Sequence, residues 1–197
     1  PNRSTMVILI VGEFIFGLGD SLLIAAGVGN TPWTVLAEGI ADTAEVWTIG
    51  EATFLVSIAV MFLWIPIKET PGIGTILNII IIALTIHVMV PILPQSENFL
   101  VSILMASSGI VLVGIGSTMY LTANLGPGPR DGWMTGLQRA TGVPIGRVRI
   151  TIEASVLVIG IVLGGTFGIG TILFAVTIGP VVASCLSIAS RIDSTTG

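Results

Sequence analysis

The sequence predicts an all-α membrane protein in which six transmembrane helices form two inverted-topology repeats of three helices each. Hydrophobic residues make up 53% of the 197 residues and charged residues only 9%, whereas a soluble domain carries about 25% charged residues. The apolar runs are about 20 residues long, the length that a helix needs to cross the hydrocarbon core. A third observation, an internal repeat, divides the chain in two.

Six apolar segments are expected to cross the membrane. In chain order they are residues 5–28, 50–67, 73–93, 99–125, 148–163 and 169–189. A short polar helix is expected after the first and after the fourth segment, at residues 32–44 and 129–142. Each begins with a proline, which suits the first position of a helix because no intrahelical hydrogen bond is lost there. These helices are too short and too polar to be spans.

The repeat links two distant halves of the chain. A shift of 97 residues places Gly29 on Gly126 and Pro32 on Pro129. A shift of 96 residues places 72–77 on 168–173, and all six residues are identical, Gly-Ile-Gly-Thr-Ile-Leu. We therefore expect a first repeat at 1–97 and a second at 98–197, together forming one membrane domain. Because each repeat holds an odd number of spans, the second would enter the membrane from the opposite side, as in many secondary transporters.

The positive charges predict the orientation. With six spans and the N-terminal end inside, all seven Lys and Arg residues fall on the cytoplasmic side, as the positive-inside rule requires. The first outer segment carries Glu38, Asp42 and Glu45 and no basic residue. A multi-pass protein of the cytoplasmic (inner) membrane with both ends of the chain in the cytoplasm is the expectation.

Two interpretations of the short polar helices remain open. Each would be an amphipathic helix lying on the membrane surface, or a re-entrant half-helix whose first backbone N–H groups face a solute near the midplane. Four tryptophans fall near the expected interfaces and are interpreted as an aromatic belt: Trp33, Trp47, Trp64 and Trp133.

Two acidic residues lie inside the first span, where ionisable groups are costly and often functional. Glu13 and Asp20 are seven residues apart, hence on one helix face and within about 10 Å along the axis. Gly17 and Gly19 lie between them and suggest a local break in the helix. The pair predicts a proton or cation site that lines a pathway. The alternative is a pair that is neutralised or that reaches the membrane surfaces.

The start of the second short helix carries a charge pair, Arg130 and Asp131, where the first has Trp33 and Thr34. Asp131 in the first turn suits the helix dipole, whereas a cation gains nothing there. Arg130 is therefore expected to bind an anionic group, from the protein or from a substrate carboxylate or phosphate. The alternative is an arginine that anchors the loop at the lipid headgroups.

Further polar residues complete the expected substrate site and the expected set of ion-coupling residues. Glu153 follows Arg149 by four residues, a spacing that favours a local salt bridge, and Asn124 would line a pathway or bond across helices. The expected substrate site comprises Arg130, Asp131, Pro129, Asn124, Pro32, Trp33 and Thr34. The expected ion-coupling residues are Glu13, Asp20 and Glu153. No catalytic residue, metal site, cofactor or nucleic-acid partner is expected, and the sequence gives no support for an enzyme.

The stretch Gly126-Pro-Gly-Pro-Arg-Asp-Gly132, with Met134-Thr-Gly-Leu137, resembles the bacterial YczE family of small integral membrane proteins, which is YyaS/YitT-like. In the first half, Pro32-Trp33 and Gly74-Thr-Ile-Leu-Asn78 resemble its counterpart. The family commonly has Asp after the first-half Trp, where this chain has Thr34, so a symmetric acidic pair is not expected. The resemblance implies a bacterial membrane context and little about activity.

The sequence leaves three functions open. The leading hypothesis is a small secondary transporter of a small polar or anionic solute, working by alternating access between inverted repeats and coupled to protons or cations through its buried acids. A passive channel for a small solute is the second, and a non-transporting accessory or receptor protein is the third. The expected partners are the lipid bilayer and a small-molecule solute, and a homo-oligomer is left open.

Overall fold

The computed structural model describes residues 2–44 and 47–196, and over these ranges the protein is α-helical without strands. Glu45, expected in the first outer segment, lies outside the described residues. The helices are α1 (Arg3–Ala26), α2 (Pro32–Ala44), α3 (Ile49–Phe62), α4 (Trp64–Ile67), α5 (Ile73–Met89), α6 (Phe99–Ala123), α7 (Pro129–Thr141), α8 (Ile145–Val162) and α9 (Ile169–Thr196).

The helices follow the expected segments closely, and the two short helices both begin at the expected proline. Within the described ranges, four segments are long and apolar enough to cross a membrane: α1, α3 together with α4, α6, and α9 as far as Arg191. The other two expected spans are less clear. Helix α5 is apolar but has only 17 residues, and α8 carries three charged side chains near its start.

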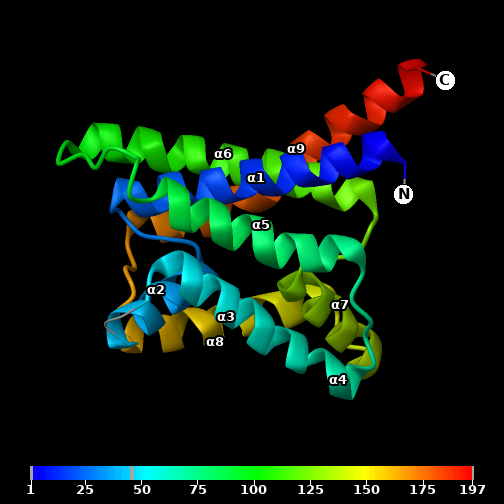
Figure 1. Ribbon diagram of the computed structural model, residues 1–197, viewed down its shortest axis with the longest axis horizontal. Coiled ribbons are helices and arrows are strands. Elements are labelled where there is room, and N and C mark those ends of the chain that lie inside the picture. Colours follow the sequence, from blue (N-terminus) through cyan, green and yellow to red (C-terminus); the bar gives the residue numbers. More distant parts are fainter. Residues whose placement is uncertain (1, 45–46, 197) are drawn as a thin grey trace.

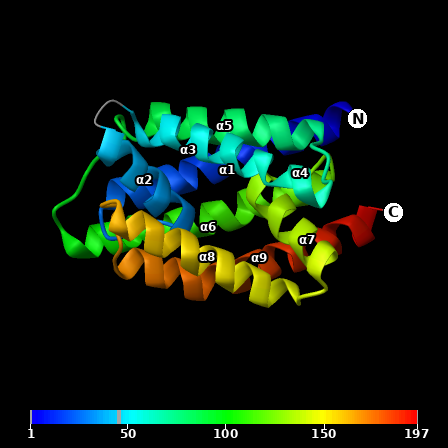
Figure 2. The ribbon, with the colours of Figure 1, turned by 90° about the horizontal axis from the view of Figure 1, so that it is seen from below.

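The helices form two layers along a common long axis (Figure 1). In one layer, α1 and α6 pack together, with α5 against α1 and α9 against α6. In the other layer, α2 packs on α8 and α3, and α7 packs on α3 and α8. The layers are joined where α3 and, to a smaller extent, α7 pack on α5. Figure 2 shows the second layer from its outer side, and both ends of the chain lie at the same end of the molecule.

Glycines bring α1 and α6 into close contact. A Cβ atom built on Gly12 would lie 3.1 Å from the Gly116 carbonyl oxygen, and one built on Gly109 would lie 2.6 Å from the Gly19 carbonyl oxygen. Residue numbers therefore rise along one helix as they fall along the other, so the two helices are antiparallel. Small residues allow such an approach of two backbones, which gains dispersion energy that lipid does not offer.

The predicted break in the first span is wrong. Helix α1 is continuous from Arg3 to Ala26, and its central glycines serve close packing instead. A Cβ atom on Gly17 would lie 2.7 Å from that of Thr85 in α5, and Gly19 faces α6.

The C-terminal ends of α1 and α6 each form a backbone hydrogen bond with the first turn of another helix in the same layer. The Val28 carbonyl, just after α1, accepts a hydrogen bond from the Gly170 N–H in α9, and the Leu125 carbonyl, just after α6, accepts one from the Gly74 N–H in α5, both at 2.8 Å. The residue after each acceptor is a glycine with positive φ, 116° and 123°, a conformation that other residues rarely adopt. The two Gly-Ile-Gly-Thr segments therefore play the same structural part.

The prediction that the four tryptophans form an aromatic belt at the membrane interfaces is also wrong for some of them. Trp33 and Trp64 are buried, and Trp133 is half-buried with its ring 6.5 Å from that of Trp33. The Trp64 indole N–H donates to the Pro129 carbonyl at 2.9 Å, and its ring fills the space beside Gly132. Only Trp47 is exposed, at 45%. Trp33, Trp64 and Trp133 therefore pack within the protein near the starts of the short helices.

The contact between α1 and α6 is tested by Gly19→Ala. The added methyl would lie 2.7 Å from the Val113 backbone nitrogen, so the helices must separate, and we expect a loss of about 1–3 kcal/mol of stability. The measurement is the thermal unfolding temperature of the purified protein in detergent. Gly179→Ala, in α9, is the matched control because its Cβ would meet nothing within 4 Å. Equal melting temperatures for the two variants would contradict this packing.

Candidate functional site

The starts of both short helices line one cavity of about 120 Å³, which has room for several water molecules. From the first come Thr31, Pro32 and Trp33, and from the second Gly128, Arg130 and Asp131. The polar lining is completed from other helices by Thr53, Ser57, Asn78, Ser117, Tyr120, Arg149 and Glu153. The starts of the two short helices therefore share one cavity.

Arg130 lines this cavity, and its side chain has no hydrogen-bonding partner among the described residues. Its guanidinium carbon lies 5.1 Å from the centroid of the Trp33 ring, a cation–π geometry. Among the described residues, no oxygen accepts a hydrogen bond from this guanidinium, and no carboxylate lies within 4.0 Å of it. A guanidinium has five N–H donors in a planar fork that matches a carboxylate or phosphate. Arg130 is half-buried and lies at this cavity.

The other charged groups of the cavity have partners. The Tyr120 hydroxyl donates to the Asp131 carboxylate, and the Arg149 guanidinium lies 2.9 Å from the Glu153 carboxylate. The latter confirms the expected local salt bridge. Arg130 is thus distinguished from Arg149, the second cation of the cavity, by its unused donors.

The two acidic residues of α1 are fully buried, so the alternative in which they reach the membrane surfaces is wrong. One Asp20 oxygen accepts a hydrogen bond from the Thr34 hydroxyl at 3.0 Å, and Thr34 in turn contacts the Thr31 hydroxyl at 2.8 Å. Within the described part of the chain, the other Asp20 oxygen and both Glu13 oxygens have no partner. Buried carboxylates without partners are costly, which is typical of a functional site in a membrane.

The expected substrate residues separate into three groups. Four of them line the cavity: Arg130, Asp131, Pro32 and Trp33. Thr34 lies next to the cavity and donates a hydrogen bond to Asp20. Pro129 is buried and engaged with Trp64. Asn124 is exposed and ends α6 in a left-handed conformation, with φ of 50°, which is a common use of Asn at a helix end. Asn124 is therefore a structural cap, placed away from the cavity.

Of the ion-coupling candidates, Glu153 lines the cavity, whereas Glu13 and Asp20 lie behind its wall. Asn78 of α5 lies beside the Glu13 carboxylate and also lines the cavity. Sequence reasoning missed Tyr120, which holds Asp131. Its only signal is that it is the single tyrosine of the chain and lies inside an apolar span.

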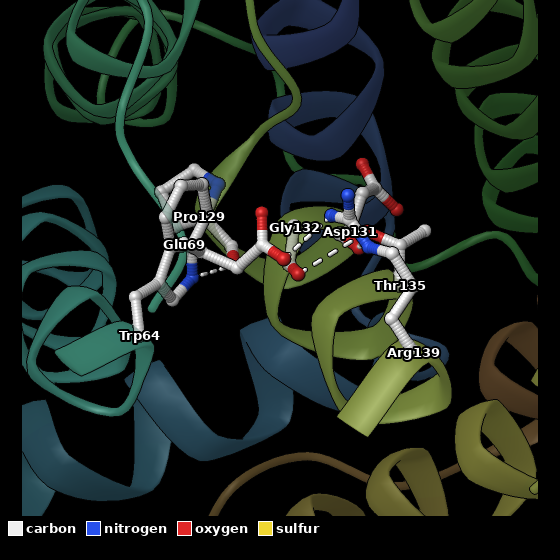
Figure 3. A network of polar contacts seen from close by, with 7 residues as sticks. All are labelled: Trp64, Glu69, Pro129, Asp131, Gly132, Thr135 and Arg139. Atoms are coloured by element: carbon white, nitrogen blue, oxygen red, sulfur yellow. Dashed lines mark hydrogen bonds and ion pairs between the residues drawn. The ribbon is translucent and has the colours of Figure 1, made fainter. Parts of the chain in front are cut away.

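A polar cluster joins α7 to the α4–α5 connection at one end of the molecule (Figure 3). The Arg139 guanidinium lies 2.6 Å from the Glu69 carboxylate. Trp64 holds the Pro129 carbonyl at the start of the same helix. The end of α7 is thus tied by a salt bridge and its start by a hydrogen bond.

A second polar cluster joins α2 to the α8–α9 connection. The Glu38 carboxylate accepts hydrogen bonds from the Asn30 amide at 2.8 Å, the Thr166 backbone N–H at 2.7 Å and the Thr166 hydroxyl at 2.8 Å. The Asn30 backbone N–H also donates to the Thr166 carbonyl, at 3.2 Å. Each short helix is therefore attached by polar contacts to a connection in the other half of the sequence.

Residues 3–187 match a family of unknown function, DUF6198. The chain belongs to this family. A Haemophilus influenzae protein described as uncharacterized is 44% identical over 188 residues, covering 95% of this chain and 86% of the relative. The uncharacterized membrane protein YczE of Bacillus subtilis is 33% identical over 173 residues, covering 85% and 79%. The uncharacterized protein YyaS of the same organism is 26% identical over 175 residues, covering 83% of each chain. No solved structure matches.

The likeness to YczE is thereby confirmed. This DUF6198 member is a helical membrane protein, consistent with both the apolar helices and the description of its Bacillus relative. The descriptions of these relatives name no substrate. The cavity therefore provides the basis for a functional proposal.

Proposed function

We propose that this protein is a small secondary transporter that moves a small polar or anionic solute through the central cavity. The observation that carries the proposal is Arg130, a cation with unused donors at the meeting point of two helix starts. No side chain caps the start of α7, so its first N–H groups add to the attraction for an anion. Trp33 keeps the guanidinium in place without using its donors.

An inverted-topology repeat of six spans supports this function, because alternating access commonly uses such halves. The contact of Gly12 with Gly116 is repeated by the contact of Gly109 with Gly19, as a two-fold relation between halves demands. Other contacts follow the same exchange: α1 with α5 and α6 with α9, then α2 with α8 and α7 with α3. In this proposal α5 and α8 are spans as well, and residues 1–97 and 98–197 are the repeats.

We interpret α2 and α7 as re-entrant half-helices that come from opposite faces. They lie towards opposite ends of the molecule (Figure 1). The first turn of each borders the cavity, while residues 138–141 at the end of α7 are exposed. A helix lying on the membrane surface would not bring its first turn to an internal cavity.

The two polar clusters are the gates of the transporter in this proposal. The cluster of Arg139 and Glu69 closes one end, and the cluster of Glu38 and Thr166 closes the other. Both ends of the chain lie at the same end as α4 and the start of α8 (Figure 1). That end carries most of the basic residues and is therefore cytoplasmic under the positive-inside rule, in the inner membrane of a bacterium.

Gates and orientation are tested together by a cysteine in the cavity. Ser117→Cys, in a Cys185→Ser background, is labelled in intact cells with a membrane-impermeant thiol reagent, and then in inverted vesicles. Glu38→Gln should raise labelling from outside, because it weakens the outer cluster. Arg139→Gln should raise labelling from the cytoplasmic side. The reverse pattern would contradict the orientation, and unchanged labelling in both variants would contradict the gates.

Transport is tested in liposomes that contain the purified protein. The liposomes are incubated with a defined mixture of small carboxylates, phosphate and nitrate, and the contents are measured by mass spectrometry. Arg130→Ala should reduce uptake at least about tenfold, because losing charge-assisted hydrogen bonds costs about 1.5–3 kcal/mol. Arg147→Ala is the matched control, since it removes an exposed arginine. Equal uptake by the two variants would contradict the site.

The same liposomes distinguish the alternatives. Uptake that depends on a proton or sodium gradient supports a secondary transporter, whereas uptake insensitive to both supports a passive channel. No uptake of any solute, together with a stable partner in pull-down experiments, supports an accessory or receptor protein.

A further inference from the structure

We infer that Asp20 balances the charge of Arg130 in the empty cavity and takes up a proton when an anion binds there. The inference rests on the proposed function, which it deepens by assigning an anionic ligand and a proton-linked residue. It starts from two groups in different helices, one a cation with unused donors and the other a fully buried carboxylate with an oxygen that lacks a partner.

The two groups are connected through the start of α2. The Asp20 carboxylate accepts a hydrogen bond from the Thr34 hydroxyl at 3.0 Å. Trp33, which precedes Thr34 in the chain, packs its ring against the Arg130 guanidinium. The distance between the charges exceeds that of a salt bridge, so space remains at Arg130 for a ligand.

The other ionisable groups that face this pair are accounted for. On α6 and α7, Tyr120 and Asp131 bond to each other, and on α8 Arg149 and Glu153 form a salt bridge. On α5 the titratable side chain is His87, which contacts the Thr48 hydroxyl at 2.9 Å.

Within the described ranges, Arg130 is therefore the cation of this cavity region that lacks a direct charged partner. The two acids near it, Asp20 and Asp131, accept hydrogen bonds from hydroxyl groups, and Asp20 keeps one oxygen without a partner. Glu13, also on α1, lies beside Asn78.

An anion on Arg130 changes this balance. The bound anion would neutralise the guanidinium and leave the buried Asp20 carboxylate without a compensating charge, which is costly in an interior of low dielectric constant. A proton from solution on the free Asp20 oxygen removes that cost. Binding of the anion and uptake of the proton therefore strengthen each other, because such coupling between two sites is reciprocal.

Infrared spectroscopy of the purified full-length chain tests the charge pair without any ligand, because protonated carboxyl groups absorb separately from carboxylates. Arg130→Ala should gain a protonated carboxyl band at neutral pH, and Arg130→Ala/Asp20→Asn should lose it again. Arg130→Gln keeps more of the side-chain volume and serves as a second variant if Arg130→Ala does not fold. Arg147→Ala should leave the spectrum unchanged. A wild-type spectrum that already contains the Asp20 band, or no gain without Arg130, overturns the inference.

Proton uptake on binding is then measured in weakly buffered detergent solution with formate, acetate and nitrate as probes. The wild type should take up about one proton for each anion bound, and Asp20→Asn should bind the anion with no uptake. Anion binding by the wild type without uptake overturns the inference. The outcome is separate from that of the liposome experiment: a carboxyl band that behaves as expected, with no solute uptake in liposomes, refutes transport and leaves the charge pair standing.

Discussion

The close antiparallel contact between α1 and α6 is the constraint on which the rest of this protein depends. Glycines on both helices bring the two backbones together at two points, Gly12 with Gly116 and Gly109 with Gly19. In lipid the hydrophobic effect does not drive helices together, so such contacts carry much of the packing energy. The ends of this helix pair then hold the starts of α5 and α9 through backbone hydrogen bonds. From those same ends the chain turns inward to the two short helices.

Two helix starts and several charged side chains lie beside one cavity, and few groups are available to compensate the buried charges. Buried Asp20 and half-buried Arg130 come from different helices and form no salt bridge with each other. Thr34 and Trp33 are their direct neighbours. Asp131 is held by Tyr120, so it does not close onto Arg130. An unsatisfied cation next to restrained acids suits reversible binding of an anion better than a tight internal salt bridge would.

The sequence predicted the helices better than it predicted the side-chain contacts. Apolar run length and proline position are local signals, and they located α2 and α7 correctly to within about one residue. The tryptophans were misread because polar neighbours suggest a membrane interface, whereas Trp33 and Trp64 pack under the short helices. Asn124 looked like a pathway residue but caps α6. The pairing of Tyr120 with Asp131 was not predictable, because it depends on how the chain folds back between two helices.

The two halves of the sequence differ at the candidate site. Both halves supply a proline-started helix, a Gly-Ile-Gly-Thr segment and a polar cluster, yet Arg130 and Asp131 stand where the first half has Trp33 and Thr34. The two first-half residues contact the charged groups of the site. The Trp33 ring packs against the Arg130 guanidinium, and the Thr34 hydroxyl donates a hydrogen bond to Asp20. The two motifs thus form a single site from unlike parts.

The most direct test of this site is a thermal-shift screen of the purified protein against small anions, because a ligand that binds the folded state raises its apparent stability. We expect that at least one small carboxylate, phosphate or nitrate raises the unfolding temperature of the wild type and of Arg147→Ala, but not that of Arg130→Ala. An anion that stabilises Arg130→Ala as strongly as the wild type would contradict it, as would a complete absence of stabilising anions.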